Sequence, residues 1–294
     1  MKMVQSLWSK PSLKSSNLNP SDRNRGGWPV AKYNYMSWTF SCLQLRKFYD
    51  DVELVTDDFG YNLLIENLEL PYTNVHVVLD CLNEYHSDLW ALGKLYTYGL
   101  QDKPFIHVDG DVFIWDRFPD IIETAELCCQ NYEVGEPGYL HVYNFIQNYF
   151  NYIPNFLVKK ENDQISSINA GIIGGTNISF FKEYVAQAFE FVNRNLDKMN
   201  GLDIGAYNMF YEQYLFFCLA IQKQSKIHYL IDDRKKLLDQ FVNFLGVPMH
   251  TNYIHTIGGF KKRFETCYLL EYTFKMSYPE QYYRLIDLLK QQKI

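Results

Sequence analysis

The chain has 294 residues, of which 47% are hydrophobic, and its formal net charge is −6 at pH 7. This length suits one large domain, or one domain with a helical appendage, and the apolar content suffices for a sizeable core. The mild acidic charge argues against broad nucleic-acid binding and does not favour an anionic membrane surface.

Cysteine spacing and hydropathy exclude further classes of protein. The six cysteines show no CxxC spacing, so we expect no zinc ribbon. Residues 1–20 are polar and lack an apolar segment, so no signal peptide is expected. No stretch approaches the roughly 18 uninterrupted apolar residues of a transmembrane helix. The expected location is therefore the reducing cytoplasm.

Strand and helix patterns alternate in the first part of the chain. The apolar runs that predict strands occupy residues 4–8, 52–55, 75–78 and 105–108. The runs that predict helices occupy residues 35–49, 61–68 and 88–98. Ser87 is the expected cap of the third helix and Gly99 its stop. This order predicts an α/β fold with a mostly parallel sheet flanked by helices.

The pattern changes after residue 115. The further predicted helices occupy residues 119–129, 179–195, 207–222 and part of 271–292. Strands are expected at 167–175 and 226–231, and polar loops at 15–29 and 250–262. Residues 133–156 are rich in Tyr, Phe and Asn without a clean period, so we expect a lid or acceptor loop there.

Two carboxylates directly follow the strand at 105–108. Asp109 and Asp111 flank Gly110, and a second apolar run follows at 112–115. Carboxylates are costly to bury unless paired, and a divalent cation is their natural partner. Asp-Gly between apolar runs also indicates a tight β-hairpin, so the motif alone leaves both possibilities open. The parallel-sheet pattern favours the metal site, because ligands bind beyond the carboxyl ends of such strands.

Two distant motifs suit the same chemistry. Residues 169–171 read Asn-Ala-Gly, and His255, Gly258 and Lys261 form an HxxGxxK pattern. Imidazole joins carboxylates on divalent transition metals, glycine opens the backbone to a diphosphate, and lysine adds a compact positive charge.

In this order the motifs resemble those of GT-A-fold glycosyltransferases, in the retaining family that includes glycogenin and the bacterial lipopolysaccharide galactosyltransferases. That family has a DxD motif after a strand, an Asn-Ala-Gly strand, an acidic-Gln pair on a later helix and a C-terminal HxxGxxK. The corresponding positions are Asp109 and Asp111, residues 169–171, Glu212 and Gln213, and His255, Gly258 and Lys261. The resemblance spans the chain to about residue 262.

Three positions depart from the family pattern. His107-Val108 replaces an aromatic-Leu-Asp lead into the DxD motif, and Glu212 replaces the usual aspartate. Lys262-Arg263 stands where Pro-Trp often follows the lysine. These departures leave the donor sugar and the stereochemical outcome open.

The resemblance implies a site for a metal ion and a diphosphate. Asp111 and His255 would bind the cation, and Asp109 would bind it or the ribose and sugar of the donor. With a histidine ligand the cation would be Mn²⁺ rather than Mg²⁺, acting as a Lewis acid on the diphosphate of a UDP-sugar. Lys261 and the Gly258 backbone would stabilise the same leaving group.

The resemblance assigns other residues to the donor. Asn169 would position the donor sugar, with Glu212 and Gln213 near the reacting carbon. Lys94, on the helix before the metal strand, would face the nucleotide, and Trp8 would meet the base.

Each assignment has a structural alternative. His255 can be a solvent-facing loop residue, residues 169–171 a strand with a bulge, and Trp8 a core residue. Glu212 and Gln213 can lie on a solvated helix face, although their strongly apolar neighbours favour a functional role.

The predicted organisation is a GT-A domain at 1–265, with a nucleotide-binding half at 1–116 and an acceptor half at 117–265, followed by a helical extension at 266–294. The predicted activity is metal-dependent, retaining transfer of a hexose to a glycan, lipid-linked or protein acceptor. Expected partners are the nucleotide-sugar and that acceptor, with no nucleic acid. The enzyme would lie in the cytoplasm or at the inner face of the membrane.

Two other functions stay open. A nucleotidyltransferase uses a similar sheet and metal, and needs a Gly-rich basic loop close to the first strand. Residues 23–27 are the only candidate, somewhat late after that strand. A catalytically silent nucleotide- or glycan-binding module shares the fold, but it has no need to keep the metal-binding set.

Overall fold

The structure, a computed structural model, describes residues 1–13, 24–157, 164–231 and 241–294. It divides into two compact units, each treated separately below. The terminal unit comprises Lys2–Asn83, Val108–Arg117 and Lys235–Ile294, and the central unit comprises Met1, Glu84–His107 and Phe118–Arg234. Within the described ranges, no helix is both long and apolar enough to cross a membrane.

Three parallel strands form the sheet of the terminal unit. β1 (Lys2–Leu7) pairs with β2 (Val52–Thr56), which pairs with β3 (Asn74–Val77). The long helix α2 (Ala31–Phe48) lies between β1 and β2 in sequence, as the parallel pairing requires. A short helix, α1 (Lys10–Leu13), follows β1.

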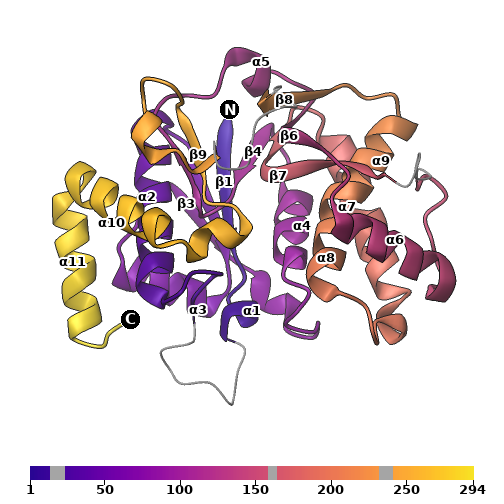
Figure 1. Cartoon of the computed structure of the whole chain (residues 1–294), viewed down its shortest axis with the longest axis horizontal. Helices are drawn as coiled ribbons and strands as arrows, with labels where there is room; N and C mark the ends of the chain where they lie inside the picture. Colours follow the sequence, from indigo (N-terminus) through magenta and orange to yellow (C-terminus); the bar gives the residue numbers. More distant parts are fainter. Residues whose placement is uncertain (14–23, 158–163, 232–240) are drawn as a thin grey trace. The chain divides into compact units, whose positions relative to one another are not determined.

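The C-terminal helices complete the core of the terminal unit. α10 (Phe264–Ser277) and α11 (Pro279–Lys290) both pack against α2 (Figure 1). Phe40 of α2 lies with its ring 5.0 Å from Phe113 and 5.9 Å from Phe274, centroid to centroid. Phe113 belongs to β5 (Val112–Ile114), which pairs antiparallel with β9 (Tyr253–His255). This core therefore joins three segments that are distant in sequence.

The smaller elements of the terminal unit are short helical turns. They are α3 (Asp58–Tyr61), a π-helix at Asn62–Asn67, and 3₁₀ turns at Leu79–Leu82, Phe244–Gly246 and Gly258–Lys262.

The central unit contains a mixed sheet in the order β4-β7-β6-β8. Its strands are β4 (Phe105–Val108, whose last residue belongs to the terminal unit), β7 (Ser166–Gly175), β6 (Leu127–Val134) and β8 (Ile227–Ile231). β6 runs antiparallel to β7 and parallel to β8. Gly174 permits a close approach to β4, because a Cβ there would lie 2.1 Å from the Phe105 carbonyl oxygen.

Helices cover this sheet. They are α4 (Ala91–Leu100), α5 (Asp120–Glu123), α6 (Pro137–Tyr149), α7 (Ile178–Asn193), a 3₁₀ turn at Leu196–Lys198, α8 (Ile204–Met209), a π-helix at Phe210–Tyr214 and α9 (Leu215–Gln222). Aromatic side chains fill the space between α7 and the helical segment 210–222; the Phe180 and Phe216 rings, for example, are 5.2 Å apart.

The structure confirms the predicted fold class, α/β with mostly parallel strands flanked by helices. The tight-hairpin alternative for the Asp-Gly motif is wrong, because the strand after it, β5, pairs with β9. Part of the predicted loop at 15–29 lies outside the described residues. The predicted loop at 250–262 instead contains β9 and a 3₁₀ turn.

Predictions for three further regions are wrong. The helix expected at 119–129 ends at Glu123, and the apolar run after it forms strand β6. The expected loop at 133–156 contains helix α6, whose buried residues recur at helical spacing between polar neighbours. Ser87 does not cap the third predicted helix, because α4 begins at Ala91 with Trp90 in the cap position. Gly99 does not stop this helix: it lies inside α4, where a Cβ would come within 3.0 Å of Val185 on α7. That glycine serves helix packing.

Candidate active site

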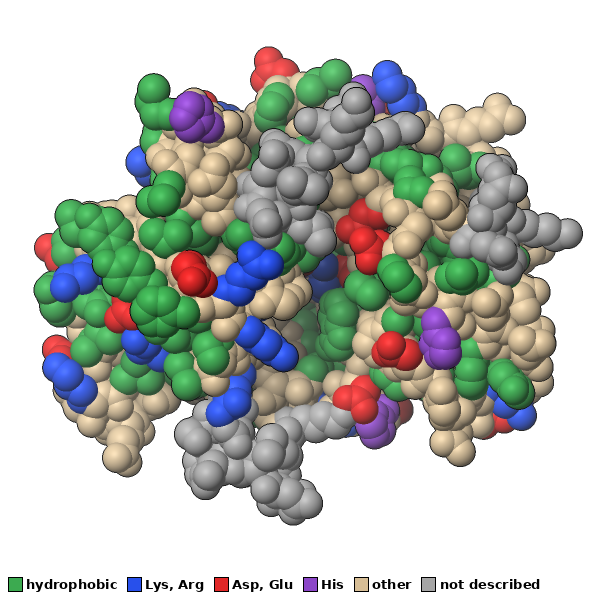
Figure 2. Space-filling model, in the orientation of Figure 1, with side chains coloured by type: hydrophobic (Ala, Val, Ile, Leu, Met, Phe, Trp, Pro, Cys, Tyr) green, Lys and Arg blue, Asp and Glu red, His purple; other side chains and the backbone are tan. Residues whose placement is uncertain are grey.

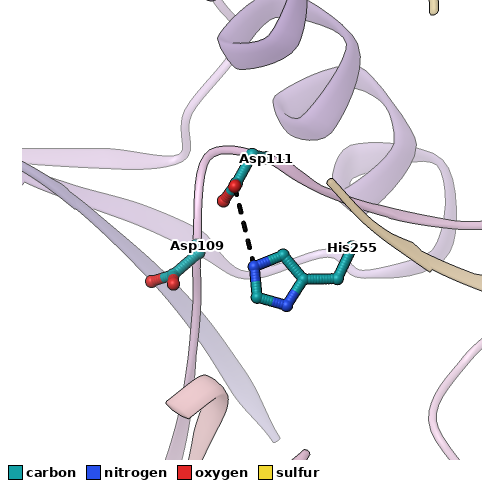
Figure 3. A group of neighbouring side chains, drawn as sticks. All are labelled: Asp109, Asp111 and His255. Atoms are coloured by element: carbon teal, nitrogen blue, oxygen red, sulfur yellow. Dashed lines mark ion pairs between the residues drawn. The ribbon is translucent and has the colours of Figure 1, made fainter. Parts of the chain in front are cut away.

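A candidate metal site forms in the terminal unit. The β5–β9 pairing places Val112 opposite His255, so that the histidine lies next to Asp111, 144 positions away in sequence. Ligand atoms of Asp109, Asp111 and His255 all lie within 4.8 Å of one another. Figure 3 shows the Asp111 carboxylate directed at the imidazole, with Oδ2 at 3.6 Å from Nε2. The structure therefore brings the three predicted metal ligands together.

Side-chain hydrogen bonds hold the loop that carries the two aspartates. Each carbonyl from residue 108 to residue 112 accepts at least one such bond. Gln5 donates to the carbonyls of 108 and 109, Ser37 to that of 110, Thr256 to that of 111 and Ser41 to that of 112. With its backbone held this way, the loop can present its carboxylates in a fixed direction.

Gly110 has a packing role in this loop. A Cβ on this residue would lie 2.6 Å from the Trp38 indole of α2, so that no larger residue fits. The glycine between the carboxylates thus lets the loop rest on α2. This packing contact accounts for a glycine at position 110.

Lys261 contacts the metal-ligand set. Its Nζ lies 2.8 Å from Asp111 Oδ2 and donates to the Gly26 carbonyl at 3.2 Å. Burial alone would raise the pKa of Asp111, but the charges of Lys261 and His255 outweigh it and hold this pKa well below its usual range. Asp111 is therefore ionised at neutral pH. Asp111 Oδ2 thus faces both the His255 imidazole and the Lys261 ammonium group.

The chemistry of this set fits a divalent cation. Two carboxylates supply hard oxygen ligands, and the imidazole adds a nitrogen that transition metals prefer. The side chains of Asp111 and His255 are only 12% and 6% exposed, so water would be largely excluded from a bound ion.

Two other predicted residues of the terminal unit have different surroundings. Trp8 is buried, and its indole N–H donates to the Asn83 side chain at 3.2 Å. Gly258 adopts a φ of +52°, which favours glycine, and a Cβ there would meet no atom within 4 Å. Their predicted roles toward the base and the diphosphate stay predictions.

A buried network joins the other predicted residues in the central unit. Lys94 Nζ lies 2.7 Å from Glu212 Oε1 and 3.2 Å from the Ala170 carbonyl oxygen. The Tyr98 hydroxyl donates to Glu212 at 2.9 Å, and Glu212 is 1% exposed. Glu212 is thus on no solvated face. Burial, with a smaller contribution from Lys94, holds the pKa of His107 well below its usual value and keeps this imidazole neutral.

Asn169 and Gln213 belong to the same network. Gln213 Oε1 accepts from the Ala170 N–H at 3.1 Å, and Asn169 Oδ1 accepts from the Gly171 N–H at 2.9 Å. Asn169 Nδ2 donates to Glu133 Oε1 at 2.8 Å. The β6–β7 ladder is irregular at this point: Cys129 pairs with Ile173 and Asn131 with Asn169, so that residues 170–172 of β7 lie opposite the single residue 130 of β6. The Asn-Ala-Gly motif thus lies at a bulge in β7, as the structural alternative predicted, and its role toward the donor sugar stays a prediction. Glu212 and Gln213 sit on a π-helical turn, a feature frequent at functional sites.

Sequence reasoning missed Glu133 and the residues around Lys261. Glu133 lies on β6, whose residues the sequence predicts partly as a helix (119–129) and partly as a loop (133–156), so the sequence does not show that Glu133 lies beside β7. Gly27 has a φ of +87°, and a Cβ there would lie 3.3 Å from Lys261 Cδ. The Gly-Gly-Trp sequence at 26–28 was the available signal for this contact.

Comparison with known proteins gives one family and several similar folds. A family model described as "Family of unknown function (DUF6734)" matches residues 1–288. No curated protein matches the sequence.

Among solved structures, the chain is similar to the galactosyltransferase LgtC in complex with donor and acceptor sugar analogues, with 11% identity, 72% of this chain and 70% of that chain covered, and a TM-score of 0.40. It is similar to the bifunctional glycosyltransferase WbbM, with 10% identity, coverage of 96% and 51%, and a TM-score of 0.48. It is also similar to the glycosyltransferase GlyE of Streptococcus pneumoniae, with 9% identity, 99% of this chain and 63% of that chain covered, and a TM-score of 0.44. The chain thus spans about half of WbbM.

Proposed function

We propose that this chain, which belongs to the DUF6734 family, is a metal-dependent glycosyltransferase with a nucleotide-diphosphate sugar, a UDP-sugar, as donor. One observation carries the proposal: ligand atoms of Asp109, Asp111 and His255 lie within 4.8 Å of one another, and the Lys261 ammonium group contacts the Asp111 carboxylate. Two carboxylates, an imidazole and an ammonium group suit a cation that carries a diphosphate.

The terminal unit would hold the diphosphate. Asp111 and His255, with Asp109, would hold Mn²⁺, which as a Lewis acid supplies stabilisation of the negative charge on the departing nucleoside diphosphate. Lys261 would add its ammonium charge next to the oxygens of the same diphosphate. The hydrogen bonds to the 108–112 carbonyls would keep both carboxylates in place as charge moves to the leaving group.

The central unit would act on the donor sugar. In the proposal Asn169 positions the sugar, and Glu133 fixes the Asn169 amide through their 2.8 Å hydrogen bond. Gln213, which accepts a hydrogen bond from the Ala170 N–H, would lie near the reacting carbon. Glu212, held by its ion pair with Lys94, would lie close to that carbon. The retaining outcome rests on the HxxGxxK resemblance, and the acceptor would be a polysaccharide, a lipid-linked glycan or a protein.

Thermal unfolding tests the proposal directly. The melting temperature is measured with UDP and with GDP, each with and without Mn²⁺, for the wild type, Asp111→Asn and the exposed control Asp116→Asn. A ligand at about 100 times its dissociation constant stabilises by about 2.7 kcal/mol, which is a readable shift. We expect UDP to stabilise the wild type and the control only with Mn²⁺, and Asp111→Asn to lose the effect. No shift with either diphosphate under any metal condition would refute the proposed function.

A nucleotidyltransferase is the second candidate, favoured by one observation. The Gly26-Gly27 segment contacts Lys261, which in turn contacts Asp111 of the candidate metal site. A nucleotidyltransferase would have its glycine-rich loop at such a position. However, its contact uses the Gly26 carbonyl, and a phosphate loop presents N–H groups. Incubation with UTP and a sugar phosphate separates the two functions, since only a nucleotidyltransferase releases pyrophosphate.

A further inference from the structure

A polar pocket in the central unit has no role in the chemistry described so far. Its volume is about 550 Å³, within the usual range for small-molecule sites. It lies where the end of α6 meets the 3₁₀ turn at Leu196–Lys198. The side chains that line it include Phe145, Tyr149, Asn148, Asn151, Asn200 and Asp197.

The lining combines aromatic faces with neutral amides. The Phe145 and Tyr149 rings lie 4.7 Å apart at an interplanar angle of 45°, and Tyr149 is 61% exposed. Three asparagine side chains supply both donors and acceptors. The single carboxylate, Asp197, is paired with its neighbour Lys198 at 3.1 Å. The pocket therefore presents hydrogen-bonding groups without a net charge.

A buried asparagine fixes the walls of this pocket. Asn195, which is 0% exposed, accepts through Oδ1 from the N–H groups of Asn151 and Tyr152. Its Nδ2 donates to the carbonyls of Tyr152 and Phe191. The segment after α6 is thus tied to the end of α7, and the pocket needs little reorganisation to accept a ligand.

From this lining the structure assigns a carbohydrate-binding site to the pocket. A pyranose has C–H groups on its faces and hydroxyl groups around its rim. The C–H hydrogens, which carry partial positive charge, pack on the negative faces of aromatic rings such as Tyr149. The hydroxyl groups exchange hydrogen bonds with amides of the kind that Asn148 and Asn200 supply. A charged ligand such as a nucleotide would find no opposing net charge here.

The place of the pocket on α6 indicates which part of a glycan it holds. Tyr139, near the start of α6, donates to Glu133 of the buried network at 3.4 Å, whereas Tyr149 ends the helix in the pocket. Ten residues of α-helix span about 15 Å. The pocket would therefore bind a sugar of the acceptor chain several units from the reacting one, an acceptor role that rests on the proposed function.

Affinity electrophoresis tests the assignment. The full chain is run in native gels containing glycogen, laminarin, hydroxyethyl cellulose or soluble xylan, and dissociation constants are taken from the loss of mobility. We expect at least one polymer to retard the wild type and Tyr149→Phe, which keeps the ring. Tyr149→Ala should bind about tenfold more weakly, because a ring contact of this kind is lost.

An exposed tyrosine of the terminal unit provides the matched control. Phe264, Tyr268 and Tyr272 form a row along α10, with 76%, 55% and 53% of each residue exposed, and Figure 2 shows hydrophobic side chains over this helix. Tyr272→Ala should therefore bind the polymer as the wild type does.

Three results would overturn the assignment: no retardation by any of the four polymers, equal retardation of Tyr149→Ala and wild type, or loss of binding in Tyr272→Ala instead. Melting temperatures with UDP and Mn²⁺ are measured on the same variants. If Tyr149→Ala retains that shift, its loss of polymer binding concerns the pocket alone. If no diphosphate stabilises the wild type while the polymer still binds, the proposed function fails and the carbohydrate site stands.

Discussion

The two clusters of ionisable residues differ in how their charges are satisfied. In the terminal unit, Asp111 is shared by Lys261 and His255, whose side chains are 18% and 6% exposed. In the central unit, Glu212 is 1% exposed and bound by both Lys94 and Tyr98. The Asp111 carboxylate can exchange one positive partner for another, whereas the Glu212 carboxylate is enclosed by Lys94 and Tyr98. We call the first group the open cluster and the second the closed cluster. A site that binds a cation needs the first arrangement, and a scaffold that fixes backbone geometry is served by the second.

Removing one partner of the closed pair gives the largest expected effect. Lys94→Met leaves the Glu212 carboxylate buried without its counter-charge, which costs about 3–5 kcal/mol in the free energy of unfolding. The measurement is denaturant-induced unfolding. The control is Lys223→Met, which breaks the exposed Lys223–Glu183 pair and should cost less than about 1 kcal/mol. Equal losses in the two variants would show that the central network is not closed.

The second-largest expected effect is a loss of folding stability at acidic pH, caused by His107 of the central unit. Burial holds the pKa of His107 well below 6.5, its ordinary value. Below pH 6.5 the unfolded chain takes up a proton that the folded chain refuses, so the stability present above this pH is lost as the pH falls. The slope is about 1.4 kcal/mol per pH unit, or about 2 kcal/mol by pH 5.

Unfolding curves of the wild type and His107→Gln between pH 7.5 and pH 5 measure this effect. The difference in unfolding free energy between the two proteins should move by the stated slope in favour of the variant as the pH falls. A difference that is constant across this window would mean that the His107 imidazole takes up its proton in the folded state.

The contrast between the clusters also shows what the sequence can predict. The alternating apolar runs and the order of the DxD, Asn-Ala-Gly and HxxGxxK motifs are local patterns, and they predicted the α/β fold. The contact of His255 with Asp111 depends on the antiparallel register of two three-residue strands, β5 and β9. Such short strands carry too little hydrophobic pattern to specify a partner. The motif resemblance therefore supplied the pairing that periodicity alone does not reach.

The closed cluster was harder to predict for a related reason. No local signal links Lys94 to Glu212, which lies 118 positions later, and the sequence directed Lys94 to the nucleotide. Glu133 was missed because the apolar run of β6 follows a short helix without a clear break. A buried charge finds its partner through tertiary packing, so the sequence shows that one is needed without showing which.

The smallest expected effect concerns exchange at the open cluster. Lys261 Nζ and His255 Nε2 both face Asp111 Oδ2, so a cation held by Asp111 and His255 would compete with the ammonium group for this carboxylate. Lys261→Met should therefore bind Mn²⁺ alone about tenfold more tightly, or about 1.4 kcal/mol, while its affinity for UDP in the presence of Mn²⁺ falls. Electron paramagnetic resonance of free Mn²⁺ measures the first constant and isothermal titration calorimetry with UDP the second, with the exposed neighbour Lys262→Met as control. If Mn²⁺ alone binds Lys261→Met no better than the wild type, the lysine and the cation do not compete for the Asp111 carboxylate. The open cluster would then have to hold its metal through Asp109 and His255.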